Sequence, residues 1–315
     1  MTSSERFSLT ASDGFPVSVF RWSPAGQARA ALQIVHGMAE HAARYSPFAE
    51  RCAAAGIAVY AHDQRGHGSS IHGEATRGHF ADDAGWSKVL GDVRAVQQRL
   101  RDERPGVPVF ILGHSMGSFV TRAHLLEHDV GVSGAILSAT GWRAGLLNAL
   151  LGWVAAREAR TLGARAPSAR MRSLVFGTFN LRLRPARTAF DWLSRDPAVV
   201  DAYMADPLCG FDCSGQLWAD LFAAIRDIER AEASPTRLAR TLPLFLMAGT
   251  HDPVSMGGLG HGQLAARYRA AGNTDVDDRR YPEARHELVN ETNREEVWRD
   301  VIGWIDARVS SSLRA

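Results

Sequence analysis

The run VFILGHSMGS, from Val109 to Ser118, constrains the fold of this chain more than any other stretch. Four apolar residues suited to a buried parallel strand lead directly into Gly-x-Ser-x-Gly, and a helix-compatible segment follows from Phe119 to Glu127. A strand, a tight turn and a helix in this order hold the serine in strained backbone geometry. Glycines at 113 and 117 relieve crowding two positions either side of it, so Ser115 is expected to project above the edge of a sheet.

Strands and helices alternate along most of the remaining chain. An Asp13-Gly14 turn between two alternating segments predicts an antiparallel hairpin near the N-terminus. The later apolar runs are separated by amphipathic helical segments, which predicts an α/β fold with a mostly parallel eight-stranded sheet and helices on both faces. Strands are expected at 7–11, 17–22, 30–35, 57–60, 109–112, 132–137, 244–247 and 276–281, and helices at 45–55, 86–101, 119–127, 264–271 and 295–309.

The interval from about Gly141 to Glu232 breaks this alternation. It contains no clear strand, and its pattern indicates several helices inserted between two strands of the sheet. We therefore divide the chain into a core, residues 1–140 and 232–315, and a helical cap, residues 141–231, which is expected to cover Ser115.

The first half of this cap is basic and partly very apolar. Residues 141–190 contain nine arginines and a single acid, Glu158. They also contain the run 146–154, LLNALLGWV, which either packs the cap onto the core or contacts a lipid surface. The arginines either attract anionic headgroups or simply solvate the cap. Both pairs of interpretations stay open at the level of sequence.

Composition excludes several classes of protein. Hydrophobic residues make up 45% of the chain and charged residues 22%, as in ordinary globular proteins. A net charge of +2 is too small for nucleic acid to be the main partner. No apolar run reaches the roughly 18 residues needed to cross a bilayer. The polar start MTSSER lacks the apolar core of a signal peptide, so we expect a cytoplasmic protein.

Cysteine and histidine spacing gives no metal signature. The three cysteines, Cys52, Cys209 and Cys213, do not form a disulfide framework. The CxxxC pair at 209 and 213 has no second ligand pair nearby, and none of the twelve histidines stands in an HExxH arrangement. We expect ordinary reduced thiols and no metal.

Three residues in a fixed chain order predict nucleophilic catalysis. A serine hydroxyl needs a general base, and the base needs an orienting carboxylate. After a strand–Gly-x-Ser-x-Gly–helix unit, the acid follows a later strand and the histidine lies in a late loop. Asp252 lies just beyond the apolar strand 244–247, and His286 lies beyond the last predicted strand. Ser115, Asp252 and His286 are therefore the candidate nucleophile, acid and base.

The developing oxyanion needs two backbone N–H donors. Met116, directly after the serine, is one candidate, and Met38 in the loop HGMAEH is the other. His36 in that loop is interpreted as a structural histidine. In the turn HDQRGHGS, Asp63 and Arg65 are expected to tie loops together by hydrogen bonds and charge pairing.

Six segments in order, HGMAEH, HDQRGHGSS, LGHSMGS, SRDP…DPL, AGTHDPVS and ARHELVNE, make the chain similar to the monoacylglycerol lipase/lysophospholipase branch of the α/β-hydrolases. The resemblance extends from about residue 7 to 308. It implies the α/β-hydrolase fold with an inserted cap, the triad Ser115, Asp252 and His286, and Met38 and Met116 as oxyanion donors. Ala39 departs from the family pattern, because many relatives carry glycine beside the oxyanion residue.

The resemblance implies hydrolysis of carboxylic esters of lipids through an acyl-enzyme, with no metal or organic cofactor. Monoacylglycerol or lysophospholipid is the expected substrate, and a short-chain carboxylesterase or other small-ester hydrolase is the alternative. Peripheral membrane contact through the cap is a further expectation. A prolyl-type peptidase would need a carboxylate in the cap to hold a free amine, and the first half of the cap is almost devoid of acids. Proteins of this fold that serve only as ligand-binding modules usually have a damaged triad, whereas all three members are present here.

Overall fold

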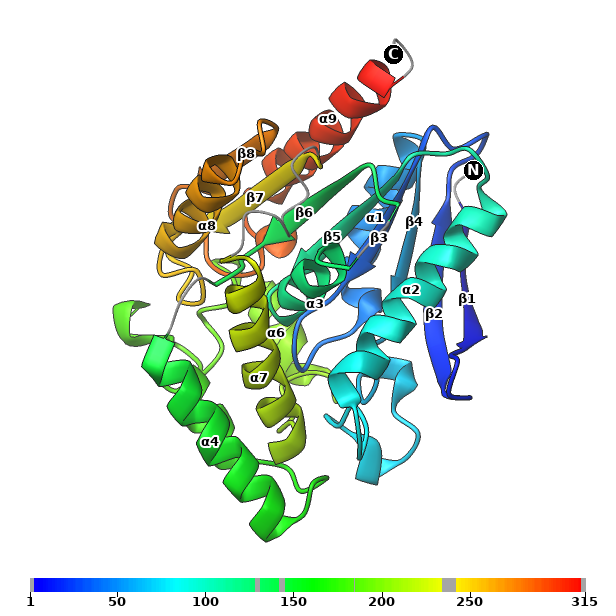
Figure 1. Ribbon diagram of the computed structural model, residues 1–315. Coiled ribbons are helices and arrows are strands. Elements are labelled where there is room, and N and C mark those ends of the chain that lie inside the picture. Colours follow the sequence, from blue (N-terminus) through cyan, green and yellow to red (C-terminus); the bar gives the residue numbers. More distant parts are fainter. Residues whose placement is uncertain (1–2, 128–130, 142–144, 184, 234–241, 313–315) are drawn as a thin grey trace.

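Eight strands form one sheet in the computed structural model, which describes residues 3–127, 131–141, 145–183, 185–233 and 242–312 (Figure 1). The strand order is β1-β2-β4-β3-β5-β6-β7-β8. The strands are β1 (Ser3–Thr10), β2 (Pro16–Ser23), β3 (Ala30–Val35), β4 (Ile57–His62), β5 (Val109–His114), β6 (Gly134–Ser138), β7 (Leu244–Gly249) and β8 (Val276–Tyr281).

The sheet is antiparallel at one end and parallel elsewhere. Strands β1 and β2 form the predicted hairpin across the Asp13-Gly14 turn, and β2 pairs antiparallel with β4. All pairs from β4 through β3 to β8 are parallel, so their carboxyl ends meet at one edge. Every residue of β3, β4, β5 and β7 is buried, as expected of strands covered on both faces. The predicted α/β class and the eight strands are confirmed.

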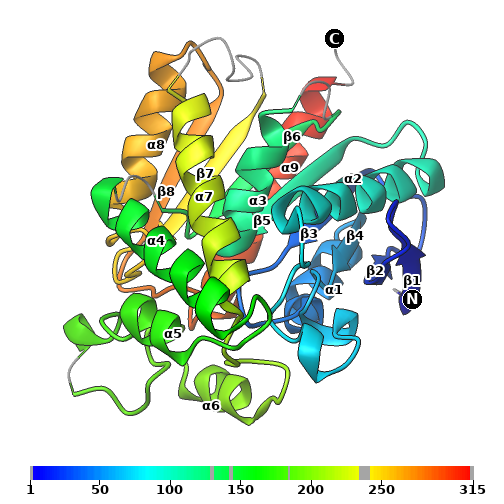
Figure 2. The same cartoon turned by 60° about the horizontal axis from the view of Figure 1, so that its bottom comes forward.

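Among the described residues, four α-helices lie between β6 and β7, in the interval where the alternation of the sequence stops. They are α4 (Gly145–Leu162), α5 (Ala169–Phe176), α6 (Pro197–Ala205) and α7 (Gly215–Ala231), and they lie beyond the carboxyl edge of the sheet (Figure 2). Helices α4 and α7 pack closely because Gly152 faces Phe222 and Gly215 faces Ala159. The division at residues 141 and 231 stays a prediction, and Arg143 and Arg184 of the basic half lie outside the described residues.

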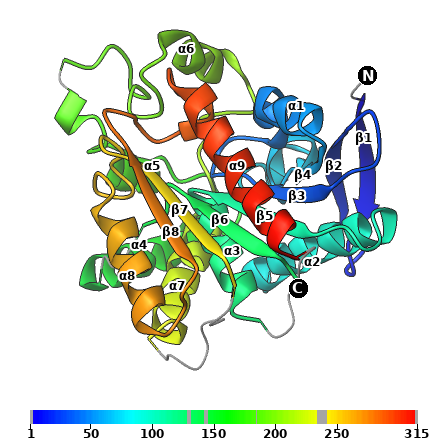
Figure 3. The same ribbon diagram turned by 90° about the horizontal axis from the view of Figure 1, so that it is seen from above.

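Helices cover both faces of the sheet. On one face lie α1 (Ser46–Ala54) and α9 (Arg294–Ser312), and on the other lie α2 (Gly85–Glu103), α3 (Met116–Leu125) and α8 (Leu259–Ala270) (Figure 3). The apolar cluster on the second face continues from α3 into α7, so the inserted helices share a core with the sheet. Short 3₁₀ helices are η1 (Ala42–Tyr45), η2 (Gly68–Ser70), η3 (Glu74–Thr76), η4 (Leu181–Leu183) and η6 (Leu288–Asn290).

One buried arginine on α3 holds both ends of the inserted segment. Arg122 donates to the carboxylate of Glu232, which follows α7, at 2.7 and 3.0 Å. It also donates to the carbonyl of Gly141, where the chain leaves β6, at 2.9 Å. Both side chains of the ion pair are fully buried. Removing one partner of such a pair typically costs about 3–5 kcal/mol, so the points where the insert joins the sheet are firmly fixed.

Candidate active site

Ser115 occupies the sharp turn between β5 and α3. Its backbone angles, φ 52° and ψ −120°, lie outside the regions that L-residues normally adopt. The Ser115 N–H donates to the carbonyl of Ser138 at the end of β6, at 3.0 Å, and the Ser115 carbonyl accepts from the N–H of Ser118 at 2.9 Å. Ser115 is the only residue from 109 to 122 that is partly exposed rather than buried. The turn therefore presents this serine at the carboxyl edge of the sheet.

Two glycines make this turn sterically possible. A Cβ at Gly117 would lie 2.1 Å from the carbonyl oxygen of Val35, and one at Gly113 would lie 2.4 Å from the carbonyl oxygen of Gly117. Real Cβ atoms do not approach backbone oxygens so closely, because the repulsion would displace the strand or the helix. The crowding predicted two positions either side of Ser115 is therefore present.

His286 and Asp252 meet across two loops at the same edge. The Nδ1 of His286 lies 2.8 Å from Oδ1 of Asp252, and both side chains are buried. Gly249, at the end of β7, lets the loops approach, because a Cβ there would lie 2.1 Å from the carbonyl oxygen of Ala284. The close packing of the end of β7 against the loop after β8 thus brings the acid to the histidine.

Hydrogen bonds keep the Asp252 carboxylate ionised. Burial by itself raises the pKa of Asp252. The nearby His286 and the hydrogen bonds from His286, Ser255 and Val254 outweigh this effect, and the pKa lies below its usual value. An ionised acid at this position can orient the imidazole and stabilise its protonated form.

Ser115 and His286 line the same small pocket with Met38. The two side chains do not hydrogen-bond to each other in this conformation. Such contacts are often loose in free enzymes and tighten when substrate binds. The structure therefore brings the three sequence-predicted residues to one edge of the sheet, with the Asp252–His286 half already connected.

Aromatic and imidazole rings that the sequence reasoning missed fix the position of His286. Trp192, which lies between α5 and α6, places its ring 4.9 Å from the His286 ring, and its carbonyl accepts the His286 N–H at 3.3 Å. The ring of His114, at the end of β5, lies 4.7 Å from the His286 ring. Burial, with a smaller contribution from His286, lowers the pKa of His114 to about 4, so His114 is neutral near pH 7. Only the variable position inside Gly-x-Ser-x-Gly hinted at His114 in the sequence.

The loop from His36 to His41 carries Met38 and is held from several sides. The Nε2 of His36 accepts from the backbone N–H of Gln64 at 3.0 Å, and its Nδ1 lies 2.7 Å from the carbonyl of Gly37. Burial lowers the pKa of His36 well below its usual value, which agrees with the structural role expected of it. Asp63 accepts from the N–H groups of Ala42 and Ser69, and Arg65 pairs with Asp13 and Asp92, so this turn ties loops together as predicted.

The backbone N–H groups of Met38 and Met116 remain available for a ligand. Within the described part of the chain, neither donates a hydrogen bond to a protein oxygen. Both residues line the cavity that begins at Ser115. Ala39 beside Met38 has φ 52°, the left-handed conformation that favours glycine. Ala39, where many relatives carry glycine, therefore has to adopt a conformation that is unfavourable for alanine.

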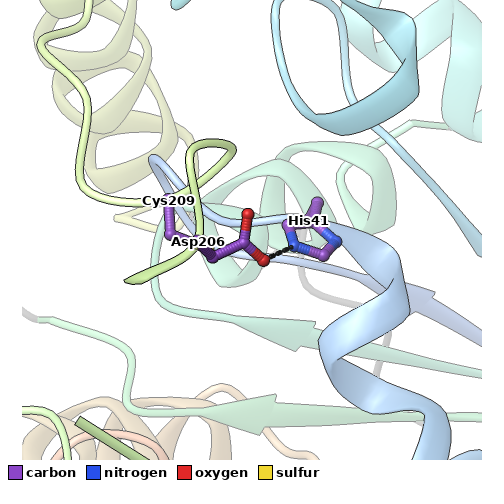
Figure 4. A group of neighbouring side chains, drawn as sticks. All are labelled: His41, Asp206 and Cys209. Atoms are coloured by element: carbon purple, nitrogen blue, oxygen red, sulfur yellow. Dashed lines mark hydrogen bonds and ion pairs between the residues drawn. The ribbon is translucent and has the colours of Figure 1, made fainter. Parts of the chain in front are cut away.

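His41, Asp206 and Cys209 form a cluster that resembles a metal site (Figure 4). Their ligand atoms lie within 4.8 Å of one another, but His41 Nε2 and Asp206 Oδ2 are only 2.8 Å apart. Two ligands of a tetrahedral zinc ion lie about 3.4 Å apart, so the direct hydrogen bond would have to open. Burial also raises the pKa of the Cys209 thiol, which opposes the thiolate that a metal requires. The cluster fits better as a link between the Met38 loop and the end of α6.

Two cavities adjoin Ser115 and differ in character. The small one, about 30 Å³, is lined by many aromatic and other apolar side chains and by the charged residues Glu40, Arg172 and Glu287. The large one, about 340 Å³, extends beneath α4, α5 and α7 and has mostly apolar walls. Ser115 thus lies between a small pocket that contains charged groups and a large apolar cavity.

The sheet order, the strained serine turn and the acid–histidine pair define an α/β-hydrolase. A family model described as serine aminopeptidase, S33, matches residues 26–293, and the chain belongs to that family. Over 90% of each chain it is 32% identical to a monoacylglycerol lipase of Mycolicibacterium smegmatis. It is 29% identical to human monoglyceride lipase, over 78% of this chain and 72% of the human one.

Solved structures agree with this relationship. A thermostable carboxyl esterase from Bacillus coagulans superposes with a TM-score of 0.89 at 25% identity and covers 98% of this chain and 99% of its own. A monoglyceride lipase variant from Saccharomyces cerevisiae superposes with a TM-score of 0.74 at 19% identity, covering 97% and 94%, which supports the fold alone. The chain matches these lipases along most of its length and is therefore a carboxylic ester hydrolase. Its resemblance to the monoacylglycerol lipase branch implied the same class of enzyme.

Proposed function

We propose that this protein hydrolyses long-chain monoacylglycerols, with Ser115 as nucleophile, His286 as general base and Asp252 as its orienting acid. One observation carries the choice of substrate: the apolar cavity of about 340 Å³ that begins at Ser115. Hydrocarbon gains free energy when it leaves water for such a cavity, about 0.8 kcal/mol for each methylene that is fully buried. The relatives named for monoacylglycerol lipase activity support the same substrate class.

The reaction proceeds through an acyl-enzyme. Ser115 Oγ attacks the ester carbonyl carbon while His286 takes the hydroxyl proton, and the N–H groups of Met38 and Met116 stabilise the oxyanion by about 3 kcal/mol each. His286 then gives the proton to the departing glycerol oxygen as the ester bond breaks. Water attacks the acyl-enzyme with His286 again as base, and the fatty acid leaves. Asp252 holds the imidazole in the required tautomer throughout.

The charges at the small pocket favour a neutral alcohol over a phosphate. Arg44 bonds to Glu40 at 2.8 Å and to both carboxylate oxygens of Glu287 at 2.5 and 2.6 Å. Two carboxylates in the wall against the one guanidinium of Arg44 behind them leave a formal charge of −1, and Arg172, a cation in the wall, bonds to Asp212. A phosphate would meet net negative charge there, whereas glycerol hydroxyls can donate to carboxylates. This charge balance supports monoacylglycerol over lysophospholipid.

The mouth of the apolar cavity supports contact with a lipid surface. Leu147, Leu174 and Met256 line the cavity and are 56%, 47% and 45% exposed. Leu146 and Leu150 on α4 extend this apolar surface outward. Exposed apolar groups around a cavity mouth are typical of a protein that takes its substrate from a membrane or micelle. Within the described residues, no helix combines the length and apolar character that a membrane span requires.

Cytoplasmic location is part of the same proposal. The three cysteines are buried and free of disulfides, which suits a reducing compartment. Peripheral membrane contact would then occur from the inner side of the cell membrane.

The decisive experiment is a substrate profile of the wild type beside Ser115→Ala. Monoacylglycerols, lysophospholipids and p-nitrophenyl esters from acetyl to stearoyl should give the highest kcat/KM on monoacylglycerols with long acyl chains. Ser115→Ala should lower turnover at least about 10³-fold while circular dichroism and the melting temperature stay unchanged. Turnover of acetyl and butyryl esters alone would favour the short-chain esterase. A Ser115→Ala variant that retains most activity would contradict the assignment of the nucleophile.

Two further outcomes concern rival classes. Cleavage of aminoacyl p-nitroanilides but not of esters would favour the aminopeptidase activity that gives the family model its name. A fluorophosphonate probe should label the wild type at Ser115 and leave Ser115→Ala unlabelled. If the wild type bound lipids but took up no probe, a ligand-binding module would be the better description.

A further inference from the structure

A further cavity, the outer groove, lies on the outer side of the paired helices α4 and α7. Its volume is about 410 Å³, and its lining combines small residues, among them Ala149, Gly152, Ala219 and Ala223, with Trp153 and the polar side chains of Gln216, Asp220 and Arg226. It lies back to back with the apolar cavity that begins at Ser115, because the two share exactly two of their described lining residues, Asn148 and Phe222. Phe222 is the larger and more apolar of these two.

Phe222 is held as a rigid wall. Its side chain is buried, and its ring stacks on that of Trp218 at 5.9 Å with an interplanar angle of 19°. Across the helix pair, a Cβ added at Gly152 would lie 3.1 Å from Cβ of Phe222, so α4 already approaches it closely. A ring packed from both sides has little freedom to swing aside. The partition between the two cavities is therefore a permanent feature of the α4–α7 pair.

We propose that Phe222 limits the length of the acyl chain, by closing the apolar cavity against the outer groove. This inference rests on the proposed function, because it requires an acyl chain in the cavity at Ser115. A chain too long for the cavity must leave its end in water or bend, and it loses up to about fourfold in affinity for each methylene that stays unburied. Removing the ring joins the cavity to a groove whose small side chains leave room for additional methylenes.

The test compares two substitutions that remove the same number of carbon atoms from adjacent positions of α7. Phe222→Leu opens the wall between the cavities, whereas Leu221→Ala enlarges the inner cavity alone, because Leu221 does not line the outer groove. Phe222→Ala opens the wall further. We measure kcat/KM on monoacylglycerols from 8 to about 22 carbons and confirm folding by thermal unfolding.

We expect the optimum of Phe222→Leu to move toward longer chains, and that of Phe222→Ala to move by at least about two carbons. The ratio of kcat/KM for the longest chains to that for the wild-type optimum should rise about tenfold or more, from burial of two additional methylenes. Ala223 is exposed and lines the outer groove but not the inner cavity. Adding Ala223→Trp to either Phe222 variant should fill the groove and reverse the shift. Ala223→Trp alone should leave the profile unchanged.

Three results would overturn the inference. One is an unchanged chain-length profile in a folded Phe222→Leu variant, which carries the test if Phe222→Ala does not fold. Another is an equal shift in Leu221→Ala, because cavity volume rather than the wall would then set the limit. The third is a shift that survives Ala223→Trp. A wild type that hydrolyses no long-chain ester overturns the proposed function as well, whereas a wild type active on long chains with unaltered variants overturns this inference alone.

Discussion

Ser115 and Ala39 both have positive φ angles, on the two loops that meet at the start of the apolar cavity. At Ser115 the surrounding strand and helix impose the strained geometry, and flanking glycines make room for it. Ala39 holds its loop by its carbonyl, which accepts from the N–H of Gly210 and from the hydroxyl of Tyr203, both at 2.9 Å. The position of the Met38 N–H therefore depends on a residue in an unfavourable conformation.

Substitution of Ala39 tests this dependence. A β-branched side chain is a severe outlier at positive φ, so Ala39→Val should lower the free energy of unfolding by about 2 kcal/mol. It should also lower kcat about tenfold or more, because the displaced loop misplaces one oxyanion donor. Ala39→Gly is the matched control and should keep kcat within about threefold of the wild type. Equal kcat values for Ala39→Val and the wild type would show that Met38 does not donate to the oxyanion.

At the scale of the element, α4 divides its apolar residues between two environments. Leu147 and Leu151 line the cavity, and Leu147 is also 56% exposed at its mouth. Leu146, 90% exposed, and Leu150, 56% exposed, do not line it. The buried residues of the helix are small, Ala155 and Ala159. The sequence left open whether the run 146–154 packs the cap or contacts lipid. In the structure part of this run packs, and its remaining leucines leave apolar surface free for lipid contact.

Charge substitution on the outer face of α4 tests the membrane contact. Leu146→Glu with Leu150→Glu should weaken binding to phospholipid vesicles at least about tenfold, because two leucines lose their burial in the acyl region. Hydrolysis of soluble p-nitrophenyl butyrate should not change, since neither residue lines the cavity. Leu162→Glu on the same helix, also at an exposed leucine, provides the control for added charge. If all three substitutions affected vesicle binding equally, the cavity mouth would not be the contact surface.

At the scale of the whole molecule, the loops at the carboxyl edge of the sheet bury several neutral histidines. Burial lowers the pKa values of His62, His67 and His114 to about 4 each, and that of His36 well below its usual value. In the unfolded chain these groups have pKa values near 6.5. The unfolded state therefore binds more protons than the folded state between about pH 6.5 and pH 4. The stabilisation is complete above pH 6.5 and is lost as the pH falls through this window.

Acid sensitivity should follow from these groups. We expect the free energy of unfolding, measured with urea, to fall by several kcal/mol between pH 7 and pH 5, with a slope near pH 5 that corresponds to uptake of about three to four protons. His72→Gln, at an exposed histidine, should leave that slope unchanged. A slope near zero between pH 6.5 and 5 would mean that the buried histidines already carry protons in the folded state.

The sequence by itself determined the elements and the serine turn. Local signals were sufficient there: continuous apolar runs for β3, β5 and β7, and glycines at 113 and 117 that only a strand–turn–helix requires. Chain order after that turn also indicated Asp252 and His286, because parallel strands bring their carboxyl ends to one edge.

Tertiary structure decided everything that depends on distant segments. The contact of Trp192 with His286, the closure of the cavity by Phe222 and the exposure of Leu146 arise from packing of inserted helices whose angles no local pattern specifies. Helices with apolar residues on several sides can bury any of them, and only the neighbours that arrive determine which. For this reason the candidate catalytic residues could be predicted from the sequence, whereas the shape of the cavity beside them could not.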